Sequence, residues 1–155
     1  MKDTKIEVIE KALDKALLHT LIEMSRDWAA EKSCYGYREN NQIDIEGNRI
    51  FVVQENDHIV GYLFGHVEEA KNANSIMKDG TAYFEIEELY ILPQYRCMGL
   101  GKLLFQHVEK IVSNEVEYIM LSTATKNWKA ILHFYIEELG MEFWSARLYK
   151  RVGAE

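Results

Sequence analysis

Alternating polar and apolar residues predict several short strands along this chain. Lys5–Glu10, with the sequence KIEVIE, alternates strictly, as a half-buried strand does. Arg49–Gln54 and His58–Glu69 flank Glu55–Asp57, which is predicted to form a tight hairpin turn. Three further segments fit strands, namely Thr81–Leu92, Glu117–Thr123 and Met141–Val152. The last of these would form one closing strand or a strand pair.

Helical spacing of apolar residues separates these strands. The first predicted helix covers Lys11–Glu31, and the second follows Pro93, which ends the strand before it. A third helix starts near Trp128 and ends at Gly140. Strands interleaved with helices predict an α/β or α+β fold, in which one sheet carries helices on both faces.

The strand within Phe84–Leu92, FEIEELYIL, breaks its own alternation. Phe84 and Ile86 share one face, whereas the next two apolar residues fall on the other face if alternation is strict. One extra residue between Glu87 and Tyr90 would return all four to one face. That is a β-bulge, which often lies beside a functional site and leaves backbone groups unpaired. The alternative is a strand that is buried on both faces.

Composition narrows the class of protein. A chain of 155 residues most simply forms one domain, 1–155, and its net charge of −7 argues against nucleic acid as a partner. Cys34 and Cys97 are too few for a disulfide framework. The charged N-terminal segment lacks the apolar centre of a signal peptide, and no apolar run reaches membrane-spanning length. These features predict a soluble cytoplasmic protein.

The segment Leu92–Leu104, LPQYRCMGLGKLL, joins a strand to a helix through a glycine turn. It fails the dinucleotide fingerprint, which needs a third glycine, and the Walker A loop, which needs Ser or Thr after Lys102. Backbone N–H groups in such a turn can still converge on a pyrophosphate at the positive end of the helix. Glycine at positions 99 and 101 would let the backbone approach the phosphates, and Arg96 and Lys102 would add charge at the rim. The alternative is an ordinary strand–helix turn.

Arg96, Gly99 and Gly101 form the pattern Arg-x-x-Gly-x-Gly. It resembles the pyrophosphate-binding signature of the GNAT superfamily of acyl-CoA-dependent N-acyltransferases. A second block, NWKAILHFYIEELGM at Asn127–Met141, is similar to the later motif of that family, and the spacing between the blocks also agrees. The resemblance covers about Phe84–Phe143.

This resemblance implies a mixed, mostly antiparallel central sheet of six to seven strands with helices on both faces. It implies acetyl-CoA as co-substrate and transfer of the acetyl group to a primary amine, by direct attack through a tetrahedral intermediate. The acceptor would be either a small-molecule amine, which could itself be cationic, or the terminus of a protein. The candidate cofactor contacts are Tyr90, Ile91, Arg96, Cys97, Met98, Gly99, Leu100, Gly101, Lys102 and Asn127.

Amine attack needs a general base, because deprotonating an alkylammonium of pKa ~10.4 at pH 7 costs about 4–5 kcal/mol. Glu87 is our first candidate, since it sits at the phase break and matches a position where some family members carry a basic carboxylate. Glu85 is the second candidate. The alternative is that both, together with Glu88, are solvated strand residues.

The remaining roles follow from the same resemblance. Tyr135 matches the family's tyrosine acid, which would protonate the leaving thiolate, although its place on an apolar stripe also suits a core residue. Amides near Tyr90 and Ile91 would stabilise the oxyanion. Asn127 is either a helix cap or a cofactor contact.

Several questions stay open at this stage. The histidines and cysteines have no metal-ligand spacing, so no metal is expected. A second hypothesis is an acetyl-CoA-binding regulatory or interaction module without turnover. The sequence does not specify the oligomeric state, and a homodimer is compatible with it. Glu23, Asp27 and Glu31 lie four residues apart on one predicted helix face. With the aromatic residues that follow, Trp28, Tyr35 and Tyr37, they indicate either a site for a cationic acceptor or a solvated helix face beside core aromatic residues.

Overall fold

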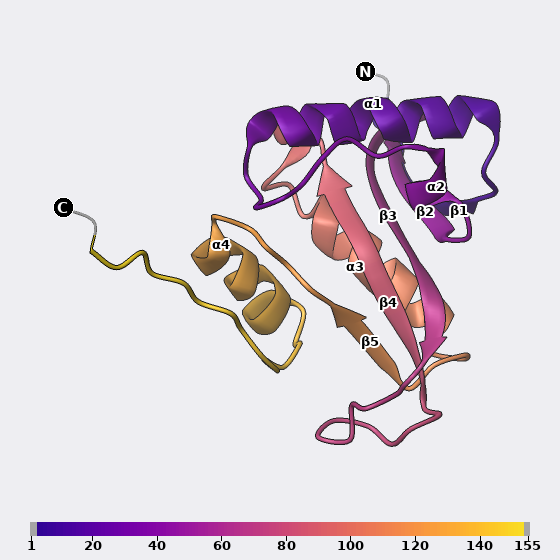
Figure 1. Cartoon of the computed structure of the whole chain (residues 1–155). Coiled ribbons are helices and arrows are strands. Elements are labelled where there is room, and N and C mark those ends of the chain that lie inside the picture. The colour runs from indigo at the N-terminus through magenta and orange to yellow at the C-terminus, as the bar shows by residue number, and fades with distance from the viewer. Residues whose placement is uncertain (1–2, 154–155) are drawn as a thin grey trace.

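The computed structural model describes residues 3–153, so that residues 1–2 and 154–155 of the expected domain lie outside the described range. A twisted sheet forms the centre, with one long helix across one face and another helix on the opposite face (Figure 1). The strands are β1 (Ile6–Lys11), β2 (Arg49–Glu55), β3 (His58–Glu69), β4 (Ala82–Ile91) and β5 (Tyr118–Leu121). The helices are α1 (Lys15–Glu31), α2 (Gln42–Ile45), α3 (Leu100–Val112) and α4 (Trp128–Leu132), with a 3₁₀ turn η1 (Pro93–Tyr95) and a π-helical segment η2 (His133–Glu138). No helix among residues 3–153 is long and apolar enough to cross a membrane.

The five strands lie in the order β1-β2-β3-β4-β5. Neighbours are antiparallel except β4 and β5, which are parallel. This confirms the mixed, mostly antiparallel sheet with helices on both faces. The turn at Asn56 and Asp57 is confirmed too, because both residues have the positive φ that a two-residue hairpin turn requires.

The predicted count of six to seven strands is wrong for the described residues, which form five. The difference lies in Met141–Val152, where an extended segment has no ladder partner. An alternating sequence gives a strand only where another backbone accepts and donates its hydrogen bonds. Here the segment runs outside the sheet, beyond α4 (Figure 1).

Two hydrophobic clusters hold the layers together. On one face of the sheet, α1 and α2 cover a cluster that includes Leu21, Ile45 and Tyr62, all fully buried. On the other face, α3 contributes Leu104 and Val108 to the larger cluster, against which α4 and η2 also pack. The sheet is therefore buried on both sides at its centre.

The predicted β-bulge in β4 is confirmed. The register against β3 shifts between Phe64, which pairs with Glu88, and Gly65, which pairs with Ile86. Glu87 is thus the extra residue, and the apolar residues on either side of it pack into one cluster on the α3 face. The strand changes phase at the position where carboxylates replace apolar residues.

Local capping explains where the helices begin. The side chain of Asp14 accepts a hydrogen bond from the Leu17 amide at 2.7 Å, so α1 starts at Lys15 rather than at Lys11 as predicted. Between α1 and β2, where the sequence predicts only a loop, Asn41 and Asp44 form a reciprocal capping box that starts α2.

Candidate active site

A cleft of about 780 Å³ opens where β4 and β5 separate. The two strands are paired only from Tyr83–Tyr118 to Ile86–Leu121. Beyond that point β4 continues alone, and the chain after β5 bonds instead to the segment after α1, with Tyr35 N–H donating to Ala124 O at 2.9 Å. The cleft is lined by the ends of β4 and β5, the turn before α3, α4 with η2, and residues 33–37.

The glycine turn forms one wall of this cleft. Gly99 has φ +80° and directly precedes α3, and Cys97 has φ +60°, which is uncommon for a residue with a Cβ. Both residues border the cleft, whereas Met98 does not. The first N–H groups of α3 have no acceptor within the helix, so the amides from Leu100 to Lys102 are free for an anion. Lys102 also lines the cleft.

Gly101 has a second role besides the one predicted. A Cβ at this position would lie 3.3 Å from the ring of Phe134 in η2. The absence of a side chain therefore lets α3 approach η2 closely, in addition to leaving the cleft side of the backbone open. At Gly99, by contrast, an added Cβ would meet nothing within 4 Å, and the positive φ is what favours glycine.

Arg96 is engaged within the protein and does not supply free charge at the rim. Its two terminal nitrogens donate to the carboxylate of Glu31 at 2.6 and 3.0 Å, and Nε donates to Ile91 O at 2.9 Å. The guanidinium also lies 5.3 Å from the ring centroid of Tyr90, whose hydroxyl donates to Glu31 at 2.7 Å. This cluster fixes the turn relative to α1 and to the end of β4.

The backbone of β4 presents two amides to the cleft. Leu92 N–H donates to Val60 O in β3, so the alternate amide of Tyr90 also points toward β3. The amides of Leu89 and Ile91 therefore point the other way, toward the side where β5 has separated. The predicted oxyanion donor Ile91 therefore has its amide directed to the cleft. The amide of Tyr90, the other predicted donor, points away from the cleft, and the amide of Leu89 points into it instead.

Glu87 borders two hollows at once. It lines the large cleft and also a smaller pocket of about 340 Å³ whose walls are α2, the loop after α2, and β3. In that pocket, His66 Nδ1 lies 3.7 Å from a carboxylate oxygen of Glu87. The other carboxylates of the pocket are Asp44 and Glu46.

Glu85 faces His66 across the ladder and does not border the cleft. Burial, with a smaller contribution from the neighbouring Glu87, raises the pKa of Glu85 to about 7. This pKa suits a general base, but Glu85 does not lie near the glycine turn or Tyr135. Of the two candidates, only Glu87 lies on the cleft.

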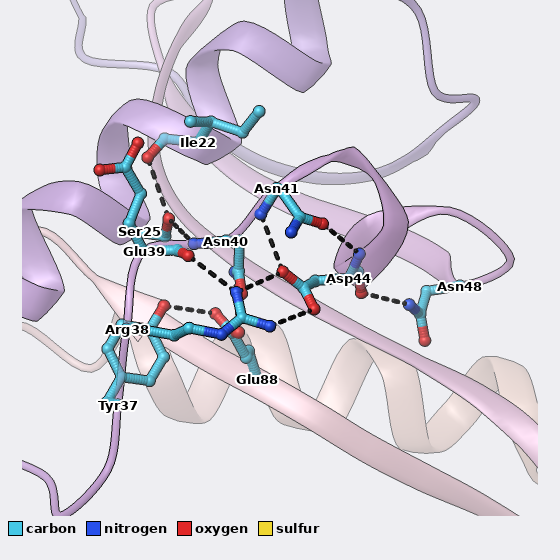
Figure 2. Close-up of polar contacts among 10 residues, drawn as sticks. All are labelled: Ile22, Ser25, Tyr37, Arg38, Glu39, Asn40, Asn41, Asp44, Asn48 and Glu88. Carbon is cyan, nitrogen blue, oxygen red and sulfur yellow. Dashed lines mark hydrogen bonds and ion pairs between the residues drawn. The ribbon is translucent and has the colours of Figure 1, made fainter.

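Glu88 is the centre of a polar network that Figure 2 shows in part. Its carboxylate accepts hydrogen bonds from Tyr37 at 2.9 Å, Tyr62 at 2.8 Å and Asn40 at 2.8 Å. Burial raises the pKa of Glu88, and these three donors partly offset that rise. Because neutral donors hold both oxygens, Glu88 anchors residues 37–40 to the bulge.

Residues 38–44 are held in place by further hydrogen bonds to α1 and α2. Arg38 makes a bidentate pair with Asp44 at 2.8 and 3.0 Å (Figure 2), and the Asn40 amide donates to the hydroxyl of Ser25 in α1 at 2.9 Å. This segment, which reaches the smaller pocket at Ile43 and Asp44, is thus held by α1, α2 and β4 together.

Tyr135 reaches the cleft from η2. Its ring packs against Phe105 and Phe134, with centroid distances of 6.4 and 5.1 Å. Burial raises the pKa of the Tyr135 hydroxyl to about 12, with a smaller contribution from Cys34. The phenol is therefore protonated at neutral pH, as a proton donor must be, and the core reading of its ring is also correct.

Asn127 is the residue before α4 and borders the cleft. Its side chain makes no capping hydrogen bond to the helix. Of the two alternatives, the structure does not support the cap, and the side chain is available to a ligand.

The carboxylates of α1 do not line the cleft, which agrees with the second alternative, a solvated helix face. Glu23 pairs with His19 on the solvent side of the helix, and Glu31 is bonded to Arg96 and Tyr90. The neighbouring aromatic residues Trp28 and Tyr37 do line the cleft, and their rings stack with a centroid distance of 4.3 Å. Trp28 also stacks on Tyr90 at 5.1 Å.

Of residues 33–37, only Tyr35 and Tyr37 were expected beside the acceptor, whereas the structure places the whole segment at the cleft. They come from a polar and aromatic segment whose sequence indicates only a loop. Their place beside the chain after β5 depends on hydrogen bonds to residues about 90 positions away, such as Lys126 N–H to Ser33 O at 2.8 Å. The aromatic content, with Tyr35 and Tyr37 at the cleft, was the one signal available.

Residues 16–141 match the model of the acetyltransferase (GNAT) family. The chain belongs to this family. The GNAT acetyltransferases use acetyl-CoA, so acetyl-CoA is the co-substrate of the domain. The free amides before and within the first turn of α3, together with the size of the cleft, fit its pyrophosphate and its length.

Solved structures share the fold at low identity. An acetyltransferase from Trypanosoma brucei is 21% identical, with a TM-score of 0.66, over 96% of this chain and 100% of that one. An aminoglycoside acetyltransferase from an uncultured soil metagenomic sample is 15% identical, with a TM-score of 0.71, over 96% and 99%. AAC(6')-Iy, solved with the bisubstrate analogue CoA-S-monomethyl-acetylneamine, is 14% identical, with a TM-score of 0.67, over 97% and 99%. Curated protein sequences give no significant match.

Proposed function

We propose that this GNAT domain is an N-acetyltransferase that moves the acetyl group of acetyl-CoA to the primary amine of a small molecule. The observation that carries the proposal is the position of Glu87, at the bulge that separates the large cleft from the smaller pocket. A base at this junction would contact an amine on one side and a thioester on the other.

Acetyl-CoA supplies an acyl group that is activated as a thioester. Its pyrophosphate would bind the amides from Gly99 to Lys102, with the Lys102 ammonium beside them. Cys97, Leu100 and Asn127 line the same cleft and would contact the rest of the molecule. Arg96 acts indirectly, since it holds the turn through Glu31.

The acceptor would enter from the smaller pocket, where Glu46 and Glu87 supply negative charge. Such a pocket favours a cationic amine. Glu87, directly or through a water, accepts the proton that the amine loses as its nitrogen bonds to the carbonyl carbon. This step offsets the cost of about 4–5 kcal/mol for having a neutral amine at pH 7.

The developing oxyanion would accept hydrogen bonds from the amides of Leu89 and Ile91. The C–S bond then breaks, and Tyr135 gives its proton to the leaving sulfur. A phenol whose pKa is about 12 regains its proton readily from Glu87 or from solvent. Proton and acyl transfer thus balance without any further reactant. The proposal includes a cytoplasmic enzyme, for which the free thiols Cys34 and Cys97 are suited.

The test is a screen of amines for acetyl-CoA-dependent release of CoA, run with Glu87→Gln and Glu85→Gln. We expect turnover with at least one amine and a loss of 10²-fold or more in kcat/KM for Glu87→Gln. Glu85→Gln is the matched control, since it removes a carboxylate of the same strand that does not border the cleft. Equal losses would remove Glu87 from the base role.

A domain that binds acetyl-CoA but releases no CoA with any amine would be the regulatory or interaction module, and the enzyme proposal would fail. Calorimetric titration with CoA separates that outcome from a protein that binds no cofactor.

A further inference from the structure

The candidate base Glu87 has few contacts that hold its side chain in place. It is the extra residue of the bulge in β4, and its side chain is 46% exposed. In the described part of the chain its carboxylate accepts no hydrogen bond, and its one ion-pair contact is His66, whose Nδ1 lies 3.7 Å from a carboxylate oxygen. A general base has to be held in place, because a displacement of about 1 Å can cost roughly 10²-fold in rate. Of the described residues, His66 is thus the one that is placed to hold Glu87.

The close approach of β3 to β4 determines where the ring of His66 lies. His66 pairs with Glu85 across the ladder, next to the register shift at the bulge. At the preceding residue, Gly65, an added Cβ would overlap the carbonyl oxygen of Glu85 and would lie 2.9 Å from the ring of Phe84. The absence of a side chain at Gly65 therefore lets the two strands meet closely here. The imidazole of His66 is held beside the bulge, in the wall of the smaller pocket.

Asn48 determines the state of one ring nitrogen. Nδ1 of His66 lies 3.0 Å from Oδ1 of Asn48. The amide nitrogen of Asn48 donates to the backbone oxygens of Asp44 (Figure 2) and Ile45 at 3.2 and 3.1 Å. Because those oxygens only accept hydrogen bonds, the amide has one orientation, with its own oxygen toward the ring. Nδ1 of His66 must then carry a hydrogen.

The second ring nitrogen also faces an acceptor. Nε2 of His66 lies 3.0 Å from a carboxylate oxygen of Glu68, two residues further along β3. A ring that donates from both nitrogens is the imidazolium, since a neutral imidazole has only one N–H. Asn48 and Glu68 together therefore fix both the orientation and the positive charge of the ring.

This charge is the cation closest to the base. None of the described residues that line the smaller pocket is Lys or Arg. Glu85, directly opposite His66, responds to the same charge: burial has the largest effect on its pKa, and His66 acts against it. The imidazolium thus faces two carboxylates of β4, and of these two only Glu87 lines the cleft.

We propose that His66 is a positioning residue for the acetyl transfer and that it acts through Glu87. Held by Asn48 and Glu68, the imidazolium attracts the carboxylate of Glu87 and keeps it at the junction of the cleft and the smaller pocket. The proposal rests on the base role of Glu87 proposed above and adds the group that orients this base, in the way that a third group orients the base of other catalytic sites.

The first test is kinetic and uses the amine that the CoA-release screen selects. We expect His66→Gln to lower kcat at least tenfold and to leave KM for acetyl-CoA within a factor of two, because the ring does not border the cleft. His58→Gln is the matched control, since His58 also lies in β3 but borders neither hollow. Thermal unfolding checks that both variants are folded.

A double variant separates positioning from direct contact with the acceptor. If His66 acts only through Glu87, His66→Gln should add no further loss in the Glu87→Gln background. A further loss there would overturn the proposal, as would wild-type kcat in His66→Gln when Glu87→Gln is impaired. Wild-type kcat in Glu87→Gln would instead remove the base itself, and the positioning role with it.

The second test needs no acceptor. In protein labelled with ¹³C at the glutamate carboxyl groups, the NMR signal of Glu87 is identified by its loss in Glu87→Gln. We expect this signal to move in His66→Gln and to keep its position in His58→Gln. A Glu87 signal that is the same in wild type and His66→Gln would show that the two side chains do not interact, and the proposal would fail whatever the amine screen returns.

Discussion

Tyr135 has two features at the scale of a single residue: a ring in the hydrophobic cluster and a hydroxyl at the cleft. Tyr135→Phe keeps the ring contacts with Phe105 and Phe134 and removes only the hydroxyl. We expect stability to change by less than about 1 kcal/mol, since the hydroxyl makes no hydrogen bond to residues 3–153. We expect kcat to fall at least tenfold, as for the loss of a general acid.

Steady-state kinetics and thermal unfolding check both expectations. Tyr118→Phe is the control, since that tyrosine lies in β5 away from the cleft. If kcat of Tyr135→Phe remains within a factor of two of wild type, Tyr135 is a core residue only.

Among elements, the turn before α3 is where a single change should separate binding from folding. Gly99→Glu places a carboxylate beside amides that we expect to bind pyrophosphate, and its positive φ costs about 1 kcal/mol for a residue with a Cβ. We expect CoA binding, measured by calorimetry, to weaken at least 100-fold. Gly80→Glu is a close control: Gly80 has φ +87°, an added Cβ also meets nothing within 4 Å, and it lies outside the cleft.

Both variants carry the same backbone strain and the same charge change, so stability should fall equally. Unchanged CoA affinity in folded Gly99→Glu would separate the turn from the pyrophosphate and leave the anion site without support.

The elements were predictable from sequence to different degrees. Periodicity located every strand of the sheet, and the phase break in β4 located the bulge at Glu87, because both signals depend on neighbouring residues alone. Met141–Val152 has the same alternation and forms no ladder with any strand among residues 3–153. A pattern specifies which face of a strand is apolar, but whether a neighbouring strand is available depends on the rest of the fold.

The site was predictable where a motif covered it. The turn, Glu87 and Tyr135 meet at one cleft as the resemblance implied. The hydrogen-bond partners of Arg96 and Glu88 were not predictable. Glu31 and Tyr37 come from segments about 50 to 65 positions away. A local sequence pattern does not show which distant side chain the fold brings opposite a charged group. These contacts explain why Arg96 holds the turn and why Glu88 is occupied.

For the whole molecule, the pair between Arg96 and Glu31 joins the end of α1 to the turn before α3, 65 residues apart. Burial alone would raise the pKa of Glu31, but hydrogen bonds from Arg96 and Tyr90 outweigh it, and the pKa is lowered below its usual value of 4.5. A carboxyl whose pKa is lower in the folded state stabilises that state above the unfolded pKa. The contribution is lost as the pH falls through the folded value.

Glu31→Gln should therefore reduce the free energy of unfolding by about 1 kcal/mol at pH 7, the size expected for a bidentate pair that is still partly exposed. The difference from wild type should shrink as the pH falls below 4.5 and should vanish once Glu31 is protonated in both states. Urea unfolding at a series of pH values measures it. Glu39→Gln removes a second bidentate pair, with Arg26, that lies in solvent and spans only 13 residues, so its effect at pH 7 should be smaller than that of Glu31→Gln. If Glu31→Gln costs the same at low pH as at pH 7, the stabilisation comes from packing of the side chain and not from its charge.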